Sequence, residues 1–168
     1  MKVEHEVKTI ALTGVMAALY IVLTLFVNIP LADRISLDLG YAVLGLLVGV
    51  LPWWSLAFIG GVGCIVKAVS LTGMFPFAWF PANILLGILL ALFCNRKSKA
   101  MKILLSVAVV FVCIGGVKTA ISFILYGIAG GQAVVIPDLI AAAADSIMLV
   151  VGILLSGTVV KVVRRAEK

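Results

Sequence analysis

The chain has 168 residues, of which 64% are hydrophobic and only 12% are charged, and its mean hydropathy is +1.32. Soluble proteins average about 45–50% apolar and about 25% charged residues, so composition excludes a water-soluble fold of this length. The net charge of +6 does not indicate nucleic-acid binding, because the basic residues gather in short clusters between apolar stretches. We therefore expect a single integral membrane domain over 1–168.

Taken in chain order, the apolar stretches predict an all-α membrane protein, a six-transmembrane-helix bundle. A helix needs about 20 residues to cross ~30 Å of hydrocarbon, and the second predicted span is shorter than that. The predicted spans are 9–29, 39–51, 55–71, 79–94, 103–128 and 138–160. Polar or turn-forming segments at 30–38, 72–77 and 129–137 are the predicted outer loops. Pro137 and Asp138 favour the start of the sixth helix.

The basic clusters predict which side of the membrane each end occupies. Even numbers of predicted spans separate them, as the positive-inside rule requires if all of them face the cytoplasm. We therefore expect a multi-pass protein of the cell membrane with both termini cytoplasmic. The clusters are Lys2 and Lys8, then Arg96, Lys97, Lys99 and Lys102, then Lys161, Arg164, Arg165 and Lys168.

The sequence contains no recognisable arrangement of catalytic or metal-binding residues. Cys64, Cys94 and Cys113 lie singly in apolar runs, without the spacing of a disulfide framework or a metal site. His5 is the only histidine and belongs to the polar N-terminal segment. The sequence contains no P-loop, GxSxG or HExxH motif. We expect no enzyme activity, no cofactor, no metal and no nucleic-acid partner.

Three charged residues, Lys67, Lys118 and Asp145, lie inside apolar runs. A charge at the centre of a membrane helix costs roughly 2.5–3.5 kcal/mol, so such residues commonly face a bundle interior and form pairs. At 1.5 Å per residue, Lys118 and Asp145 lie about 15 Å and about 12 Å below the outer ends of the fifth and sixth spans. The sequence therefore predicts a Lys118–Asp145 pair, which either serves a ligand pocket or only locks two helices together.

Other polar and aromatic residues fall at the same outer level of the bundle. Asn83 and Ser122 join the charged residues, and Phe75, Phe77, Trp79 and Phe80 surround them. Apolar walls with a few fixed polar groups are typical of small-molecule sites, so we predict a pocket that opens outward. Two alternatives stay open: Trp79 and Phe80 as interface anchors, and Arg34 and Asp38 as solvated charges or as a lid.

The first predicted span carries a face of small residues that includes Ala11, Gly14 and Ala18. Small residues allow close approach of helix backbones in a membrane. This face either packs within the chain or serves as a docking strip for a second membrane protein.

Several segments together resemble the substrate-binding S components of energy-coupling-factor (ECF) vitamin transporters. The likeness covers the six-span plan, the segments RISLDLGYAVLGLLVG and TGMFPFAWFPANILLGILLAL, and the glycine-rich third span. It implies capture of a vitamin from outside, followed by docking on a transmembrane T component driven by two cytoplasmic ATPases. The alanine-x-x-x-alanine signature of the family is not matched at Ala11, and its nearest fit is Gly14 with Ala18. The pocket residues that the resemblance implies are Arg34, Asp38, Lys67, Trp79, Asn83, Lys118, Ser122, Asp138 and Asp145.

We therefore expect the substrate-specific subunit of an ECF-type ABC importer. The cations, amide and aromatic rings favour a ligand with a flat ring and an acidic group, folate-like first, then pantothenate, riboflavin or a queuosine precursor. One alternative is a self-sufficient ion- or proton-coupled carrier that uses Lys118–Asp145 as its switch. Another is a structural membrane protein. The chain is too short for two inverted repeats around a central site, the design of many secondary transporters.

Overall fold

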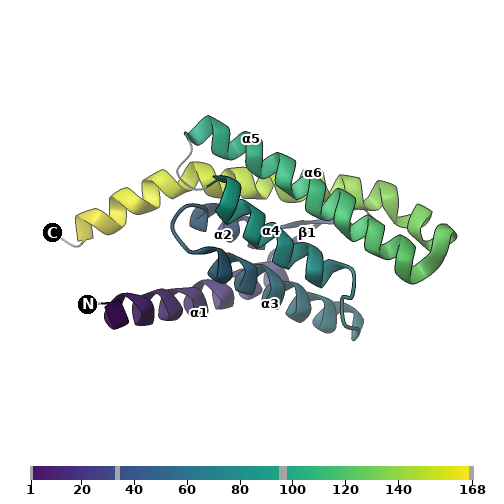
Figure 1. Cartoon of the computed structure of the whole chain (residues 1–168), viewed down its shortest axis with the longest axis horizontal. Helices are drawn as coiled ribbons and strands as arrows, with labels where there is room; N and C mark the ends of the chain where they lie inside the picture. Colours follow the sequence, from purple (N-terminus) through teal and green to yellow (C-terminus); the bar gives the residue numbers. More distant parts are fainter. Residues whose placement is uncertain (1, 33–34, 95–97, 167–168) are drawn as a thin grey trace.

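The computed structural model describes residues 2–32, 35–94 and 98–166 and is dominated by helices, with one β hairpin (Figure 1). The helical class is therefore confirmed. The elements are α1 Lys2–Phe26, β1 Asn28–Ala32, β2 Ile35–Asp38, α2 Gly40–Leu47, α3 Trp53–Thr72, α4 Trp79–Cys94, α5 Lys99–Val110, the π-helix η1 Phe111–Lys118 and α6 Thr119–Ala166.

The second half of the chain forms two long helical arms that meet at Gly127. The first arm comprises α5, η1 and the start of α6, and the second arm is the rest of α6. Gly127 has φ 72° and ψ −174°, a backbone conformation that glycine adopts without strain. Figure 1 shows the chain turning back near this point and returning toward the end of the molecule where α1 begins.

The described part of the structure does not show the six predicted spans. Among the described residues, three segments are long and apolar enough to cross a membrane: Glu6–Phe26, Trp53–Ser70 and Lys99–Gly157, the last of which contains the bend at Gly127. The shorter helix α4 has 16 residues. The predicted span 39–51 is wrong as a full crossing, because α2 has 8 residues. At 1.5 Å per residue, α2 is only about 12 Å long.

Two of the predicted outer loops are structured. The segment 30–38 belongs mostly to an antiparallel hairpin in which Asn28 pairs with Asp38. The segment 129–137 is helical, so the prediction that Pro137 and Asp138 begin the last helix is wrong. The break lies at Gly127, and Pro137 lies inside the second arm. The position of Gly127 predicts the chain reversal better than that of Pro137, since the glycine adopts the backbone conformation of a sharp turn and the proline remains inside the helix.

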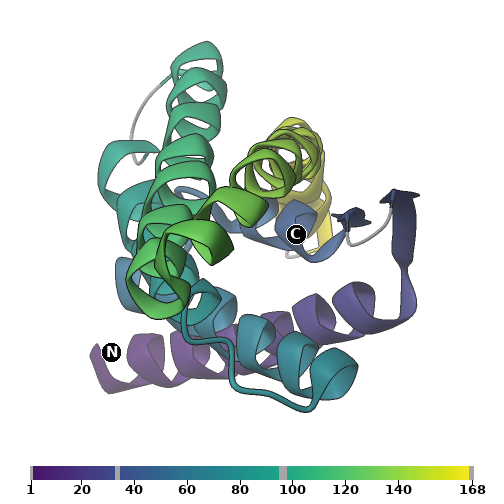
Figure 2. The same ribbon diagram turned by 90° about the vertical axis from the view of Figure 1, so that its right-hand side faces the viewer.

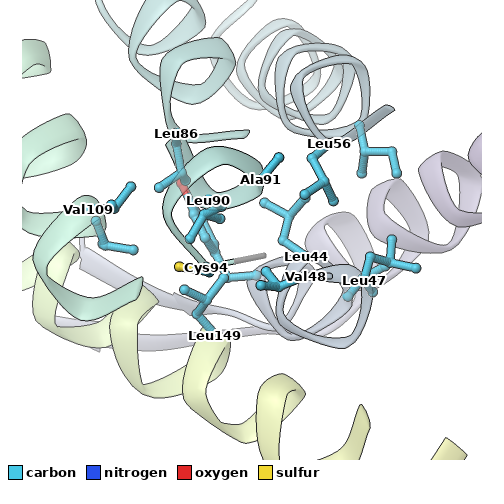
Figure 3. Packing of buried hydrophobic residues seen from close by; sticks show 14 of the residues in the cluster. Leu44, Leu47, Val48, Leu56, Leu86, Leu90, Ala91, Cys94, Val109 and Leu149 are labelled. Carbon is cyan, nitrogen blue, oxygen red and sulfur yellow. The ribbon is translucent and has the colours of Figure 1, made fainter. Parts of the chain in front are cut away.

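Apolar side chains fill the half of the bundle that lies toward the first turns of α3 and the last turns of α4 (Figure 3). Leu44, Leu56, Leu86, Leu90 and Leu149 are completely buried there. They come from α2, α3, α4 and α6, so one cluster joins four helices. The opposite half of the same helices carries most of the buried charge, as described below.

Glycines allow α2 and α6 to touch backbone to backbone. A Cβ atom on Gly45 would overlap the Leu149 carbonyl oxygen, and one on Gly152 would overlap the Ala42 carbonyl oxygen. Small residues give this close approach between membrane helices. The contact fixes the short helix α2 against the second arm.

Gly152→Val should therefore push α2 away from α6 and lower stability. Overpacking costs about 1–3 kcal/mol, which corresponds to a fall of roughly 3–10 °C in the unfolding midpoint measured in detergent. Gly14→Val is the matched control, because a Cβ on Gly14 meets no atom within 4 Å. Equal midpoints for the two variants would contradict the close contact.

Candidate functional site

A cavity of about 820 Å³ lies at the end of the bundle formed by the loop between α3 and α4 and the arms near Gly127. Figure 2 looks onto this end. Arg34 lies outside the described residues. The other residues predicted to bind substrate all line the cavity: Asp38, Lys67, Trp79, Asn83, Lys118, Ser122, Asp138 and Asp145.

Asp38 ties three helices together on one wall of the cavity. Its Oδ1 accepts bonds from Thr24 Oγ1 and from the Gly40 N–H, each 2.8 Å long. Its Oδ2 forms an ion pair with Lys67 Nζ at 2.9 Å. Asp38 is only 2% exposed, so it is neither a solvated loop charge nor a free lid residue. Three donors, one of them charged, offset the cost of burying this carboxylate.

Lys118 forms the second ion pair, and its partner is Asp138 rather than Asp145. The predicted Lys118–Asp145 pair is therefore wrong. The cause is the position of the break: measured from Gly127 at 1.5 Å per residue, Lys118 and Asp138 lie about 14 Å and about 16 Å away, and Asp145 about 27 Å. A carrier switch built on the Lys118–Asp145 pair loses its basis.

The Lys118–Asp138 pair is supported by hydroxyl groups of the first arm. Thr119 Oγ1 donates to Asp138 Oδ2 over 2.9 Å, and Ser122 Oγ donates to the Lys118 carbonyl over 3.0 Å. Lys118 and Thr119 are adjacent in sequence and both reach the same carboxylate. They lie at the end of the π-helix η1, whose i→i+5 turn is wider than an α turn and is found frequently at functional sites.

Trp79 lies close to both lysines. The Lys118 Nζ is 4.1 Å from the centre of the indole ring, and the Lys67 Nζ is 5.8 Å from it. Both distances are within the range of cation–π attraction. The side chain remains 37% exposed, so part of the indole surface is open to a ligand. This placement favours a pocket role for Trp79 over the alternative of an interface anchor.

The amide of Asn83 is held in one orientation beside Trp79. Asn83 Nδ2 donates to the Trp79 carbonyl over 3.0 Å, so Oδ1 accepts the Tyr41 hydroxyl over 2.9 Å. Tyr41 was not predicted as a site residue. Its signal was a hydroxyl-bearing aromatic side chain inside an apolar span, close to Asp38 in sequence.

Phenylalanines cluster on the loop between α3 and α4. The ring centres of Phe75 and Phe77 are 5.1 Å apart, and Phe75 also contacts Phe80 at 5.5 Å. Phe75 and Phe77 line the cavity, whereas Phe80 does not. Other lining residues that sequence reasoning missed include Tyr20, Cys64 and Tyr126. Tyr20 and Cys64 each occur alone in an apolar helix. From the sequence, such a residue can belong to the apolar core as readily as to a cavity wall.

The small residues of α1 lie on its exposed face. Ala11, Gly14 and Ala18 are exposed, whereas Thr13 and Ala17 point into the bundle. The interpretation that this strip packs within the chain is therefore wrong. The buried face of α1 instead includes Thr13 and Ala17. On this face, Thr13 Oγ1 donates to Ser55 Oγ over 2.8 Å.

A family model described as "ECF-type riboflavin transporter, S component" matches residues 4–161. The chain belongs to this family. The expected S-component family is therefore confirmed, and its description is that of a transporter subunit rather than an enzyme. The family is named for riboflavin, and it gives no support to the folate-like ligand that we expected first.

Curated relatives cover part of the chain. Two UPF0397 proteins of Streptococcus thermophilus, from strains LMD-9 and CNRZ 1066, are each 31% identical over 97 residues, 58% of this chain and 54% of the relative. A third, from strain LMG 18311, is 31% identical over 99 residues. The matches thus span about half the length of these relatives. No solved structure matches the chain.

The ion pair of Lys118 and Asp138 yields a stability test. Asp138→Leu alone leaves a buried ammonium without its partner and should cost about 3–5 kcal/mol. Lys118→Met combined with Asp138→Leu removes both charges and should recover most of that loss. Thermal unfolding in detergent measures both effects. A double variant as unstable as the single one would contradict the pairing.

Proposed function

We propose that this S component captures riboflavin from outside the cell for import by an ECF transporter. The observation that carries the proposal is the partly exposed indole of Trp79 close to two paired lysines in the wall of a cavity. The cavity volume of about 820 Å³ lies within the range of small-molecule sites. The riboflavin name of the family supports this vitamin among ligands with a flat ring.

Riboflavin suits the kinds of groups that line the cavity. Its flat tricyclic ring can stack on Trp79, and aromatic pairs of this kind contribute about 0.5–1.5 kcal/mol beyond area burial. Its hydroxylated chain needs several hydrogen-bond donors and acceptors. An ammonium has three N–H donors, and Lys67 and Lys118 each use one on an aspartate, so both retain donors for the ligand.

Riboflavin is electrically neutral, which changes the ligand type first expected. A carboxylate on the ligand would have to compete with Asp38 and Asp138 for the same two ammoniums. A hydroxylated chain needs no such competition, because it can donate to the carboxylates and accept from the lysines at once. The paired state of both lysines therefore favours a neutral polyol over an acid.

We also propose that the exposed strip of α1 docks on the T component of the transporter. Docking through Ala11, Gly14 and Ala18 requires their exposure, and all three are exposed. The first turn of α1 and the last turns of α6 lie at the same end of the bundle (Figure 1), away from the cavity. With both termini cytoplasmic, the cavity would face outward.

Purified protein should bind riboflavin, and Trp79→Leu should weaken binding by at least about tenfold, because the stacking surface is lost. Quenching of flavin fluorescence measures the dissociation constant. Trp53→Leu is the matched control, since Trp53 is exposed and does not line the cavity. Failure of the unsubstituted protein to bind riboflavin, with folate or pantothenate bound instead, would contradict the proposal.

Gly14→Leu should leave riboflavin binding unchanged and reduce riboflavin uptake, because a bulky side chain would separate two closely packed helices. Co-purification with a tagged ECF module and uptake into vesicles measure the effect. Ala143→Leu is the control, since Ala143 is exposed on α6 rather than α1. Equal uptake by the two variants would argue against docking through this strip.

A further inference from the structure

Among the residues that the structure describes, three carboxylates and two lysines line the cavity. Asp38 is matched by Lys67, and Asp138 is matched by Lys118. Within the described part of the chain, no ion pair includes Asp145. Asp145 is nevertheless only 7% exposed and lies on the cavity wall.

The Tyr41 hydroxyl lies within hydrogen-bonding reach of Asp145. This hydroxyl donates to Asn83 Oδ1 over 2.9 Å. The Asn83 amide cannot turn to release it without losing the bond from Nδ2 to the Trp79 carbonyl. A phenol has one proton, so it cannot donate to both acceptors at the same time.

The hydrogen bonds of other nearby donors go to the other two aspartates. The ammoniums of Lys67 and Lys118 are held by their own aspartates, and Thr24 and Thr119 also donate to those aspartates. A buried carboxylate with too few donors is costly, and the cost is removed when a ligand supplies one. Such a position discriminates strongly among ligands, because a ligand without the donor leaves the acceptor unpaired.

We propose that Asp145 accepts a hydrogen bond from a ring N–H of the bound ligand. The site is therefore specific for a heterocycle that presents an N–H donor at its inner edge and carries no carboxylate there. This inference rests on the proposed capture of riboflavin, whose oxidised ring has a single N–H, on the imide between two carbonyl groups. In this proposed arrangement the imide edge of the ring faces Asp145, and the hydroxylated chain meets the remaining polar groups of the cavity.

The test compares riboflavin with 3-methylriboflavin, in which a methyl group replaces that single N–H. The unsubstituted protein should bind riboflavin at least about tenfold more tightly, because hydrogen bonds to charged groups are the stronger class. Asp145→Asn has the same shape without the charge, so a preference of purely steric origin would persist in it. We expect the preference to shrink at least about fivefold in Asp145→Asn and to vanish in Asp145→Leu.

Ser146→Ala is the matched control on the same helix. The Ser146 hydroxyl donates to the Ala142 carbonyl over 2.7 Å and does not line the cavity, so this variant should keep the full preference. An unchanged preference in Asp145→Asn, or no preference in the unsubstituted protein, would overturn the role of Asp145 while riboflavin capture stands. Absence of riboflavin binding to the unsubstituted protein would overturn both.

Discussion

Two buried carboxylates hold the cavity walls in place. Asp38 accepts bonds from α1, the start of α2 and α3, and Asp138 joins the two long arms. In lipid there is no water to solvate these groups, so each carboxylate must be satisfied by protein. The helices that carry the donors are thereby fixed in rotation and depth, and both lysines are held close to Trp79 as a result.

The apolar cluster and the cavity divide the bundle between them along the helix axes. Leu56 lies near the start of α3 and Lys67 near its end, whereas α4 begins with Trp79 and carries Leu90 in its last turns. Each of these helices therefore contributes tight apolar packing at one end and ligand-facing groups at the other. Close packing resists deformation, so the core gives the cavity a rigid base.

Much of the site was predictable because charges inside apolar runs have few physical explanations. Lys67, Lys118 and Asp145 stood out for this reason, and the cost of burying them required that they gather in the interior. The pairing was not predictable, because the depth of Asp138 depends on whether the chain reverses at Gly127 or at Pro137. Both residues break helices, and local sequence does not say which one does.

The hairpin and the short helix α2 were missed for a related reason. An apolar stretch of 13 residues is ambiguous between a short crossing and a buried half-crossing, and the choice depends on partners far along the chain. Here the partner is Gly152 on α6, whose missing side chain admits α2. That contact joins residues more than a hundred positions apart, so it cannot be inferred from a short stretch of sequence.

The direction of the cavity side chains that follow η1 depends on how this helix winds rather than on residue identity alone. Ordinary α-helical winding of Phe111–Lys118 would rotate the following side chains about the arm, because each residue of an α-helix turns by about 100° and each residue of the wider turn by less. Ser122 and Tyr126 would then turn away from the ligand, although neither had been replaced. The winding of this stretch therefore determines which later residues face the ligand, although most of the lining residues lie outside it.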